Sequence, residues 1–196
     1  KFQNSAQFSL LPAAEEIGFT SPPNVFGVSG YSGAGTKPSK NNDPEFLKDN
    51  LVPYTLVNHV HEREVSYQLG TPIQFMPHVA PFFQGIGLTV SMNLKKFFFS
   101  FDKKKKKIII LIIKNKKRKV TPESLLSLYQ SYYGKQKNPI IRVGKDIPYV
   151  KFNSGKHHVS IGGFTVSTSG DHAVVVCTLD NLLKGAATQA LQVNNF

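Results

Sequence analysis

The chain has 196 residues, enough for one domain with a hydrophobic core, and its 40% hydrophobic and 18% charged residues are typical of a folded protein. Its longest apolar run, residues 108–113, is too short to cross a bilayer as a helix. The net charge of +12 would suit nucleic-acid binding, but eleven Lys and one Arg against one Asp lie between Lys95 and Lys119. Strong basicity therefore belongs to one segment, and the rest of the chain is nearly neutral.

The first half of the chain is predicted to hold one helix, several short strands and a glycine-rich loop. Strands are indicated by β-branched residues and by alternation of apolar with other side chains, and the helix by apolar residues at helical spacing. In chain order these elements are the end of a helix at 1–12, a strand at 25–28, a loop at 29–35, extended or partly helical segments at 51–60 and 64–69, and strands at 73–77 and 86–94.

Residues 97–119 differ from the rest of the chain because they are almost entirely Lys, Ile, Phe, Asn and Leu. These amino acids have adenine- and thymine-rich codons, so the segment can be translated non-coding sequence such as a retained intron. It can also be a surface insertion or a functional basic tract that binds RNA or directs the protein to the nucleus. Aromatic residues do not interleave with the lysines, which weakens the RNA-binding alternative.

A helix start follows at Thr121-Pro-Glu, where Thr suits the N-cap, Pro the first helical position and Glu the first turn. This helix is expected to end at Gly134, and Asp180 can cap a last helix over 181–192. Short apolar runs between turn residues predict four strands, at 140–143, 149–152, 159–164 and 173–178. The whole pattern predicts an α+β fold with a mixed or mostly antiparallel sheet.

Asn58-His-Val-His-Glu-Arg-Glu64 holds two histidines and two glutamates in one short stretch. The spacing of His59 and His61 suits one face of a strand, not the i, i+4 pair with which a helix binds zinc, and no third ligand is obvious. Three interpretations stay open from composition alone: a general acid/base histidine oriented by a carboxylate, a surface or structural cluster, and a metal site.

Other segments have both a functional and a structural interpretation. Gly30-Tyr-Ser-Gly-Ala-Gly35 can bring backbone N–H groups close to a ligand, but its spacing is not a dinucleotide-binding fingerprint and a plain tight turn explains it as well. His78 can line a pocket or be a core histidine. Asn181 can lie near an anion or carboxamide at a helix start, or be part of the cap. Cys177 lies in an apolar run and is expected to be a buried thiol.

Taken together and in this order, the segments resemble N-acetyl-gamma-glutamyl-phosphate reductase of arginine biosynthesis, in particular its fungal form, which is made in a mitochondrial precursor together with acetylglutamate kinase. The resemblance covers residues 3–95 and about 120–192 and skips the Lys/Ile-rich segment. Its matching motifs are Gly27-Val-Ser-Gly-Tyr-Ser-Gly-Ala-Gly35, His59-Val-His-Glu-Arg-Glu64, Phe75-Met-Pro-His78, Gln84-Gly-Ile86, Ile161-Gly-Gly-Phe164 and Asp180-Asn-Leu-Leu-Lys-Gly-Ala-Ala-Thr-Gln189.

The resemblance implies a mechanism and a role for each matching residue. A cysteine thiolate attacks N-acetyl-glutamyl 5-phosphate and releases phosphate, and NADPH then delivers hydride to the thioester, which gives N-acetyl-glutamate 5-semialdehyde. His59 would assist proton movement with Glu64 as its supporting carboxylate. The resemblance assigns the substrate pocket to His61, Arg63 and His78, and the cofactor side to Ser32, Gly33, Ala34, Gly35 and Asn181.

This sequence departs from the family pattern at the position of the nucleophilic cysteine. The family's cysteine precedes a Gln-x-x-Leu-x-Pro stretch, which Gln7-Phe-Ser-Leu-Leu-Pro12 matches, so the cysteine is expected at about Lys1. Cys177 lies in a strand pattern far along the chain and cannot replace it. We therefore expect the chain by itself to have no reductase activity.

The resemblance also implies a fold and a domain organisation. The fold is the C-terminal domain shared with glyceraldehyde-3-phosphate and aspartate-semialdehyde dehydrogenases, a mixed sheet of about six strands with helices on one face and a subunit contact on the other. Residues 1–35 would be the remnant of a nucleotide-binding domain with the active-site loop. Residues 36–178 would be the catalytic and dimerisation domain with an insertion at 96–119, and residues 179–196 a helix returning to the cofactor side.

Partners and location follow from the same resemblance. The expected cofactor is NADP, the substrate N-acetyl-glutamyl phosphate, and the assembly a homo-oligomer with acetylglutamate kinase as a further partner. The expected location is the mitochondrial matrix, with no metal, nucleic acid or membrane bound. The alternative is a non-catalytic basic protein that binds nucleic acid through residues 103–119.

Overall fold

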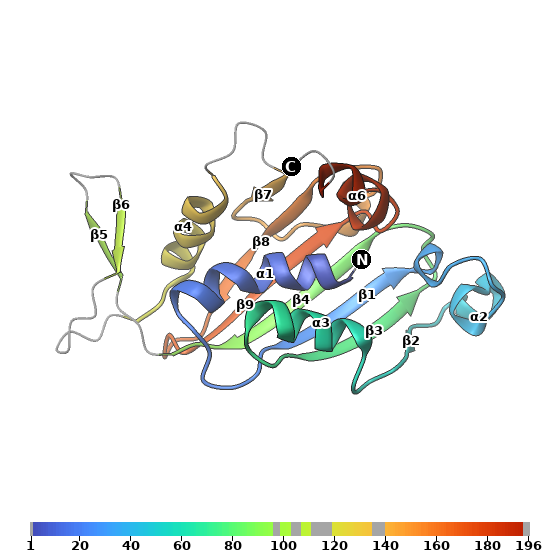
Figure 1. Ribbon diagram of the computed structural model, residues 1–196, viewed down its shortest axis with the longest axis horizontal. Helices are drawn as coiled ribbons and strands as arrows, with labels where there is room; N and C mark the ends of the chain where they lie inside the picture. Colours follow the sequence, from blue (N-terminus) through green and yellow to red (C-terminus); the bar gives the residue numbers. More distant parts are fainter. Residues whose placement is uncertain (1, 96–98, 103–106, 111–118, 135–139, 194–196) are drawn as a thin grey trace.

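Seven strands form one mixed sheet in the computed structural model, which describes residues 2–95, 99–102, 107–110, 119–134 and 140–193 (Figure 1). The strands are β1 (Asn24–Gly30), β2 (Val52–Pro53), β3 (Gln74–Ala80), β4 (Ile86–Asn93), β7 (Ile141–Val143), β8 (Val159–Val166) and β9 (His172–Leu179). They lie side by side in the order β2-β3-β1-β4-β9-β8-β7. The pairs β1–β3 and β7–β8 are parallel, and the other neighbours are antiparallel.

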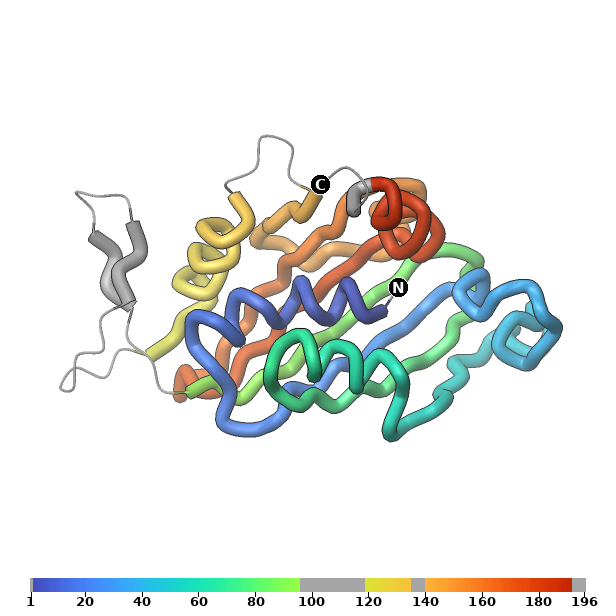
Figure 2. The backbone as a smooth tube through the Cα atoms, viewed as in Figure 1, coloured from blue at the N-terminus to red at the C-terminus, as the bar shows by residue number. Residues whose placement is uncertain are grey.

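Three longer helices cover one face of this sheet: α1 (Phe2–Glu16), α3 (Val60–Leu69) and α4 (Pro122–Tyr133) (Figure 1). The short helical segments are η1 (Tyr31–Ala34), η2 (Lys40–Asn42), α2 (Pro44–Leu47), α5 (Val150–Asn153), η3 (Leu183–Ala187) and α6 (Thr188–Val193). The chain begins beside the end of β1 and runs along the sheet as α1, which Figure 2 shows in dark blue. The predicted α+β fold, a mixed sheet with helices on one face, is confirmed.

Side chains alternate along each strand, and this alternation separates a covered face from an open one. Leu88 and Val175 point toward the helices and are almost completely buried. Phe26, Thr89 and Val176 point the other way and keep part of their surface exposed. The strand register pairs Phe26 with Thr89, and Thr89 with Val176, so these side chains form a row across the sheet. We call the side that carries them the open face.

Two tyrosines of α4 donate hydrogen bonds to carbonyls of α1 close to a proline inside that helix. Pro12 has no N–H, so the carbonyl of Phe8, one turn earlier, receives no helical hydrogen bond from it. Tyr133 donates its hydroxyl to that carbonyl at 2.7 Å, and Tyr129 donates to the carbonyl of Ser9 at 2.5 Å. The tyrosine hydroxyls therefore hold α4 against α1 at the turn where Pro12 leaves the carbonyl of Phe8 without a helical donor.

The predicted elements mostly lie where the sequence patterns indicated, with one clear exception. The helix start at Thr121 is confirmed, because its hydroxyl accepts from the N–H of Ser124 at 3.2 Å. The strand predicted at 149–152 is wrong, because Tyr149 is the N-cap of the helical turn α5 and residues 150–152 lie within that turn. Val150 of this turn lies against Gly87 on the open face. A segment this short does not distinguish a strand from a helical turn.

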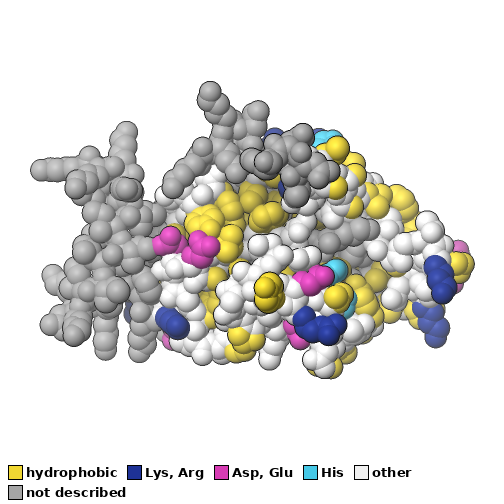
Figure 3. Space-filling view, viewed as in Figure 1, with side chains coloured by type: hydrophobic (Ala, Val, Ile, Leu, Met, Phe, Trp, Pro, Cys, Tyr) yellow, Lys and Arg dark blue, Asp and Glu magenta, His cyan; other side chains and the backbone are white. Residues whose placement is uncertain are grey.

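The Lys/Ile-rich segment contains a hairpin apart from the main sheet (Figure 1). Its strands are β5 (Phe99–Asp102) and β6 (Lys107–Ile110), and most of the proposed nucleic-acid-binding stretch 103–119 lies outside the described residues. On the side seen in Figure 3, the coloured basic and acidic side chains are scattered and do not gather into a patch of one sign. No helix among the described residues is both long and apolar enough to cross a membrane.

Candidate active site

The carboxyl ends of the parallel strands β1 and β3 meet the first turns of α1 and α3. A cavity of about 280 Å³ lies between them. Its walls include Phe2 of α1, Ser29 of β1, Gly33 of η1, Tyr54 and His61. We call this cavity the histidine pocket. It brings one member of the predicted histidine motif together with the glycine-rich loop, which lies far from it in sequence.

The histidine motif forms the start of helix α3, so of the extended and helical alternatives for these segments the helical one is found, and the strand face that suited the spacing of His59 and His61 is not. His59 has extended backbone angles and is the N-cap of α3, where its Nδ1 accepts from the N–H of His61 at 3.1 Å. The preceding Asn58 has a φ of 58°, a left-handed conformation that turns the chain into the helix. Glu62 fixes the same turn to the sheet, since its Oε2 accepts from the N–H of Phe75 at 3.0 Å.

The side chain of His59 is buried among the rings of neighbouring residues. Its side chain is 8% exposed and contacts Tyr54, His61 and Phe75, with ring centroids 5.7, 4.8 and 5.2 Å away. Burial lowers the pKa of His59, and the nearby carboxylates of Glu62 and Glu64 act in the opposite direction. Because Nδ1 accepts a hydrogen bond, the proton of the neutral ring belongs on Nε2. His59 is thus a neutral ring that orients the turn carrying His61.

His61 forms part of the pocket wall. Burial lowers the pKa of His61 to about 4, so its ring is neutral near pH 7. Among the described residues, Nδ1 of His61 and Oε2 of Glu64 are buried atoms without a hydrogen-bond partner. Buried polar atoms are nearly always paired, so two such atoms in one helical turn mark a place suited to a polar ligand.

Tyr54 is a pocket residue that the sequence did not single out. Burial raises the pKa of Tyr54 to about 12, so its hydroxyl keeps its proton. The next residue, Thr55, has a φ of 42°, a strained conformation for a β-branched side chain. The N–H of Tyr54 donates to the carbonyl of Pro77 at 3.1 Å and holds this loop against β3. Strain at a loop that presents a pocket residue is typical of functional sites.

The glycine-rich loop folds into the tight turn η1, packed directly on the loop between β3 and β4. The N–H groups of Tyr31 and Ser32 donate to the carbonyls of Phe82 and Phe83, both at 3.0 Å. Gly33 has no room for a side chain, because an added Cβ would lie 2.6 Å from Oγ of Ser29. The glycine therefore serves close packing beside the histidine pocket.

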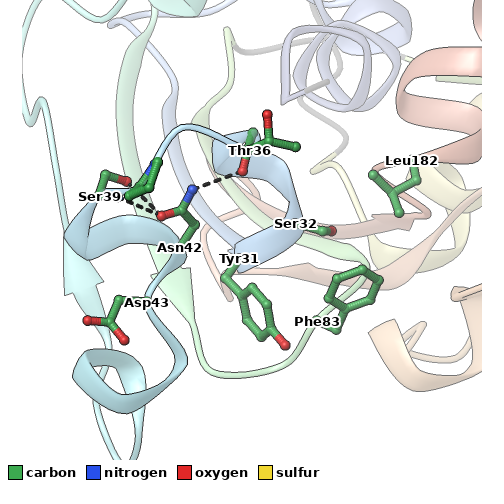
Figure 4. A pocket seen from close by; sticks show the side chains of 10 residues that line it. Tyr31, Ser32, Thr36, Ser39, Asn42, Asp43, Phe83 and Leu182 are labelled. Atoms are coloured by element: carbon green, nitrogen blue, oxygen red, sulfur yellow. Dashed lines mark hydrogen bonds between the residues drawn. The ribbon is translucent and has the colours of Figure 1, made fainter.

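A second, larger hollow lies on the other side of η1 (Figure 4). Its volume is about 700 Å³, and its walls include Ser32 and Gly35 from the predicted cofactor-binding loop. The rings of Tyr31 and Phe83 lie beside each other here, with centroids 5.3 Å apart, and Leu182 closes the far side. We call this hollow the loop pocket. The turn η1 separates the two cavities, since Gly33 and Ala34 line the histidine pocket.

Asn181 holds η1 in place through a side-chain hydrogen bond. It is fully buried, and both ends of its amide are used inside the protein. Its Oδ1 accepts from the N–H of Gly85 at 2.7 Å, and its Nδ2 donates to Oγ of Ser32 at 2.9 Å. The residue thus reaches the predicted cofactor-binding loop through Ser32.

Two residues assigned to the substrate pocket by resemblance lie elsewhere. Arg63 is exposed on α3 and lines neither cavity. His78 is on the open face, where its ring lies 4.3 Å from that of Phe26, while the adjacent Val79 lines the histidine pocket. Because neighbouring strand residues point to opposite faces, His78 and the histidine pocket are on different sides of the sheet.

The expected buried thiol is confirmed. Cys177 is completely buried on the helix-covered face, and burial raises the pKa of its thiol to about 12. It is therefore a poor nucleophile at neutral pH. Among the described residues, no three His, Cys, Asp or Glu side chains are grouped so that they could hold a metal ion.

Comparison with known proteins supports both the fold and the resemblance. The family described as "Semialdehyde dehydrogenase, dimerisation domain" matches residues 2–107. Aspartate semialdehyde dehydrogenase II from Vibrio cholerae superposes with a TM-score of 0.68 at 18% identity, covering 99% of this chain and 59% of that one. At this identity the likeness concerns the fold, and it confirms the predicted dehydrogenase-like C-terminal domain.

Curated relatives are much more similar in sequence. "Bifunctional protein argC, mitochondrial" of Dictyostelium discoideum is 55% identical over 96% of this chain and 19% of its own length. "Protein arg11, mitochondrial" of Schizosaccharomyces pombe is 48% identical over 100% of this chain and 19% of its own. "N-acetyl-gamma-glutamyl-phosphate reductase" of Xanthomonas campestris is 45% identical over 100% of this chain and 54% of its own. The chain thus spans about half, or less, of the length of these relatives.

Proposed function

This chain belongs to the family of semialdehyde dehydrogenase dimerisation domains, and on that basis we propose that it is the substrate-side part of an N-acetyl-gamma-glutamyl-phosphate reductase. The reaction replaces the phosphate of N-acetyl-glutamyl 5-phosphate with hydride and yields the 5-semialdehyde, a step of arginine biosynthesis. The observation that carries the proposal is the histidine pocket, where Tyr54 and His61 meet η1 at the N-terminal end of α1.

The histidine pocket suits an acyl group because its polar groups are neutral at working pH. His61, as a neutral ring, can donate a hydrogen bond from its ring N–H to an acyl oxygen, and this bond would stabilise an oxyanion that forms there. We assign the substrate contact to His61, because it lines the pocket, and the orientation of its turn to His59. Glu64, the supporting carboxylate of the resemblance, has a free buried oxygen in the same turn.

The nicotinamide cofactor of such dehydrogenases supplies the hydride, and we propose NADP for this protein. The loop pocket suits the nicotinamide end, because the aromatic rings of Tyr31 and Phe83 give it an apolar wall and Gly35 has open space beside its Cα. Ser32 and Gly35 would contact the ring system there, while Gly33, Ala34 and Asn181 hold the turn in place. His78 and Arg63 have no part in either pocket in this proposal.

Assembly and location complete the proposal. A dimerisation domain forms homo-oligomers, and the open face offers the row of Phe26, Thr89 and Val176, with an apolar side chain on each side of Thr89, for a second copy of the chain. His78 would lie in that contact. The two eukaryotic relatives carry "mitochondrial" in their names, which supports a mitochondrial location. The proposal of acetylglutamate kinase as a partner rests on the sequence resemblance alone.

The test is turnover by the full-length protein that carries this chain. We expect oxidation of NADPH to depend on N-acetyl-glutamyl phosphate, with release of phosphate and semialdehyde in equal amounts. Aspartyl phosphate is the control, because it is also an acyl phosphate of an amino acid but has a free amine and one methylene fewer. Equal or faster turnover of aspartyl phosphate would refute the proposed substrate.

A further inference from the structure

Asp180 is a completely buried carboxylate at the end of β9, surrounded by hydrogen-bond donors. Its Oδ1 accepts from the N–H groups of Leu182 and Leu183, both at 2.8 Å, and so caps the chain segment that leads into η3. Its Oδ2 accepts from the N–H of Gly155 at 2.6 Å and from the side-chain amide of Gln84. Both side-chain oxygens therefore act as hydrogen-bond acceptors in these contacts.

Gln84 connects this carboxylate to the loop on which η1 rests. The loop is the short connection between β3 and β4, and its carbonyls at Phe82 and Phe83 hold the N–H groups of Tyr31 and Ser32. The loop has a further support on its far side, since Oγ of Ser154 donates to the carbonyl of Gln84 at 3.0 Å. A side-chain displacement at Gln84 would therefore be passed on to η1.

We propose that Asp180 and Gln84 are positioning residues of the reductase reaction, which fix η1 between the histidine pocket and the loop pocket through their buried hydrogen bond. This inference rests on the proposed function. Neither side chain lines either cavity, so they act through η1 and not on the substrate.

The geometry explains why the pair would govern turnover more than binding. Gly33 of η1 forms part of the histidine pocket, and Ser32 forms part of the loop pocket. A shift of η1 changes the distance between the two cavities while the walls made by Tyr54 and His61 stay in place. Misplacement of reacting groups by about 1 Å can slow a reaction roughly 100-fold.

Three variants of the full-length protein test this with N-acetyl-glutamyl phosphate and NADPH. Asp180→Asn places an amide NH₂ against two donors, and Gln84→Glu places a second carboxylate against Asp180. We expect each to lower kcat roughly 10- to 100-fold with a much smaller change in KM. The double variant Asp180→Asn/Gln84→Glu reverses donor and acceptor, and it should recover part of the lost kcat.

Controls separate positioning from folding. Gln74→Glu makes the same chemical change at an exposed position at the start of β3 and should leave kcat unchanged. Thermal unfolding of every variant reports the folded fraction, to which kcat is normalised. Gln84→Met removes the hydrogen bond without adding charge, and it carries the test if a charged variant does not fold. Its kcat should fall as well, without recovery on adding Asp180→Asn.

The inference is wrong if kcat of the folded Asp180→Asn, Gln84→Glu and Gln84→Met variants stays within about twofold of wild type. It is also wrong if the double variant is no faster than the slower single variant, since a merely structural role gives no rescue. A wild-type protein without turnover would instead refute the proposed function, and this inference with it. The two failures are therefore distinguishable.

Discussion

His61 makes the stability of the protein depend on pH. Its folded-state pKa of about 4 lies below the ordinary value of 6.5 because burial penalises the charged ring. The unfolded chain therefore binds this proton more readily, and the folded state loses stability as pH falls from 6.5 toward about 4. Over this range we expect Tm of the wild type to fall more steeply than that of His61→Asn. Parallel Tm profiles of the two proteins would contradict the assignment.

Cys177 should be inert toward thiol reagents while the chain is folded. Its thiol is fully buried, and its pKa of about 12 leaves almost no thiolate at neutral pH. We expect the 196-residue chain to release no chromophore from a disulfide reagent at pH 8, and to react once its single cysteine is exposed in denaturant. Rapid reaction of the native chain would show that β9 is not packed as described.

At the scale of single residues, the sequence indicates which side chains can take part in a reaction better than it indicates which residues surround them in the fold. The residue types of the His59–Glu64 motif indicate acid/base chemistry, but the spacing of its histidines suits a strand. The N-cap hydrogen bond of His59 Nδ1 adds no periodic pattern that would indicate the helix. Tyr54 was missed because it lies in a loop whose strained backbone cannot be read from residue types. The bond between Asp180 and Gln84 joins residues 96 positions apart, and neither segment alone indicates it.

At the scale of elements, the contact between α1 and α4 depends on a proline and a tyrosine together. Tyr133→Phe leaves the carbonyl of Phe8 without the donor that replaces the missing N–H of Pro12, which should cost about 1–3 kcal/mol. In the variant Pro12→Ala an N–H is restored, so Tyr133→Phe should cost less in that background. Urea unfolding of the four proteins measures the coupling, and additive effects would disprove it.

Helices and strands with a regular pattern of apolar side chains or with capping residues can be predicted from the sequence, but helical segments of a few residues cannot. The strands β4, β8 and β9 and the capped helix α4 lie close to their predicted bounds because alternation or capping residues define them. The residue types at 149–152 predict a strand where the structure has the turn α5, since so short a segment fits both. Its place on the open face is set by close packing of Val150 against Gly87, which involves two distant segments.

At the scale of the whole molecule, the open face is proposed to carry the contact between subunits. In the proposed subunit contact, Thr89→Arg would bury an unpaired charge in the middle of the row formed with Phe26 and Val176. We expect this variant to elute as a monomer at micromolar concentration, measured by light scattering after size exclusion, and the wild type to elute as a dimer. Gln68→Arg on the exposed side of α3 is the control and should stay dimeric. A dimeric Thr89→Arg protein would place the contact elsewhere.

The central claim is that the histidine pocket is where the acyl group reacts, and the kcat of His61→Asn tests it most directly. The measurement uses the full-length protein with saturating N-acetyl-glutamyl phosphate and NADPH. His157→Asn is the matched control, because this exposed histidine lines neither cavity. We predict that His61→Asn lowers kcat by roughly 100-fold or more while the control keeps it. A folded His61→Asn protein with wild-type kcat would contradict the account.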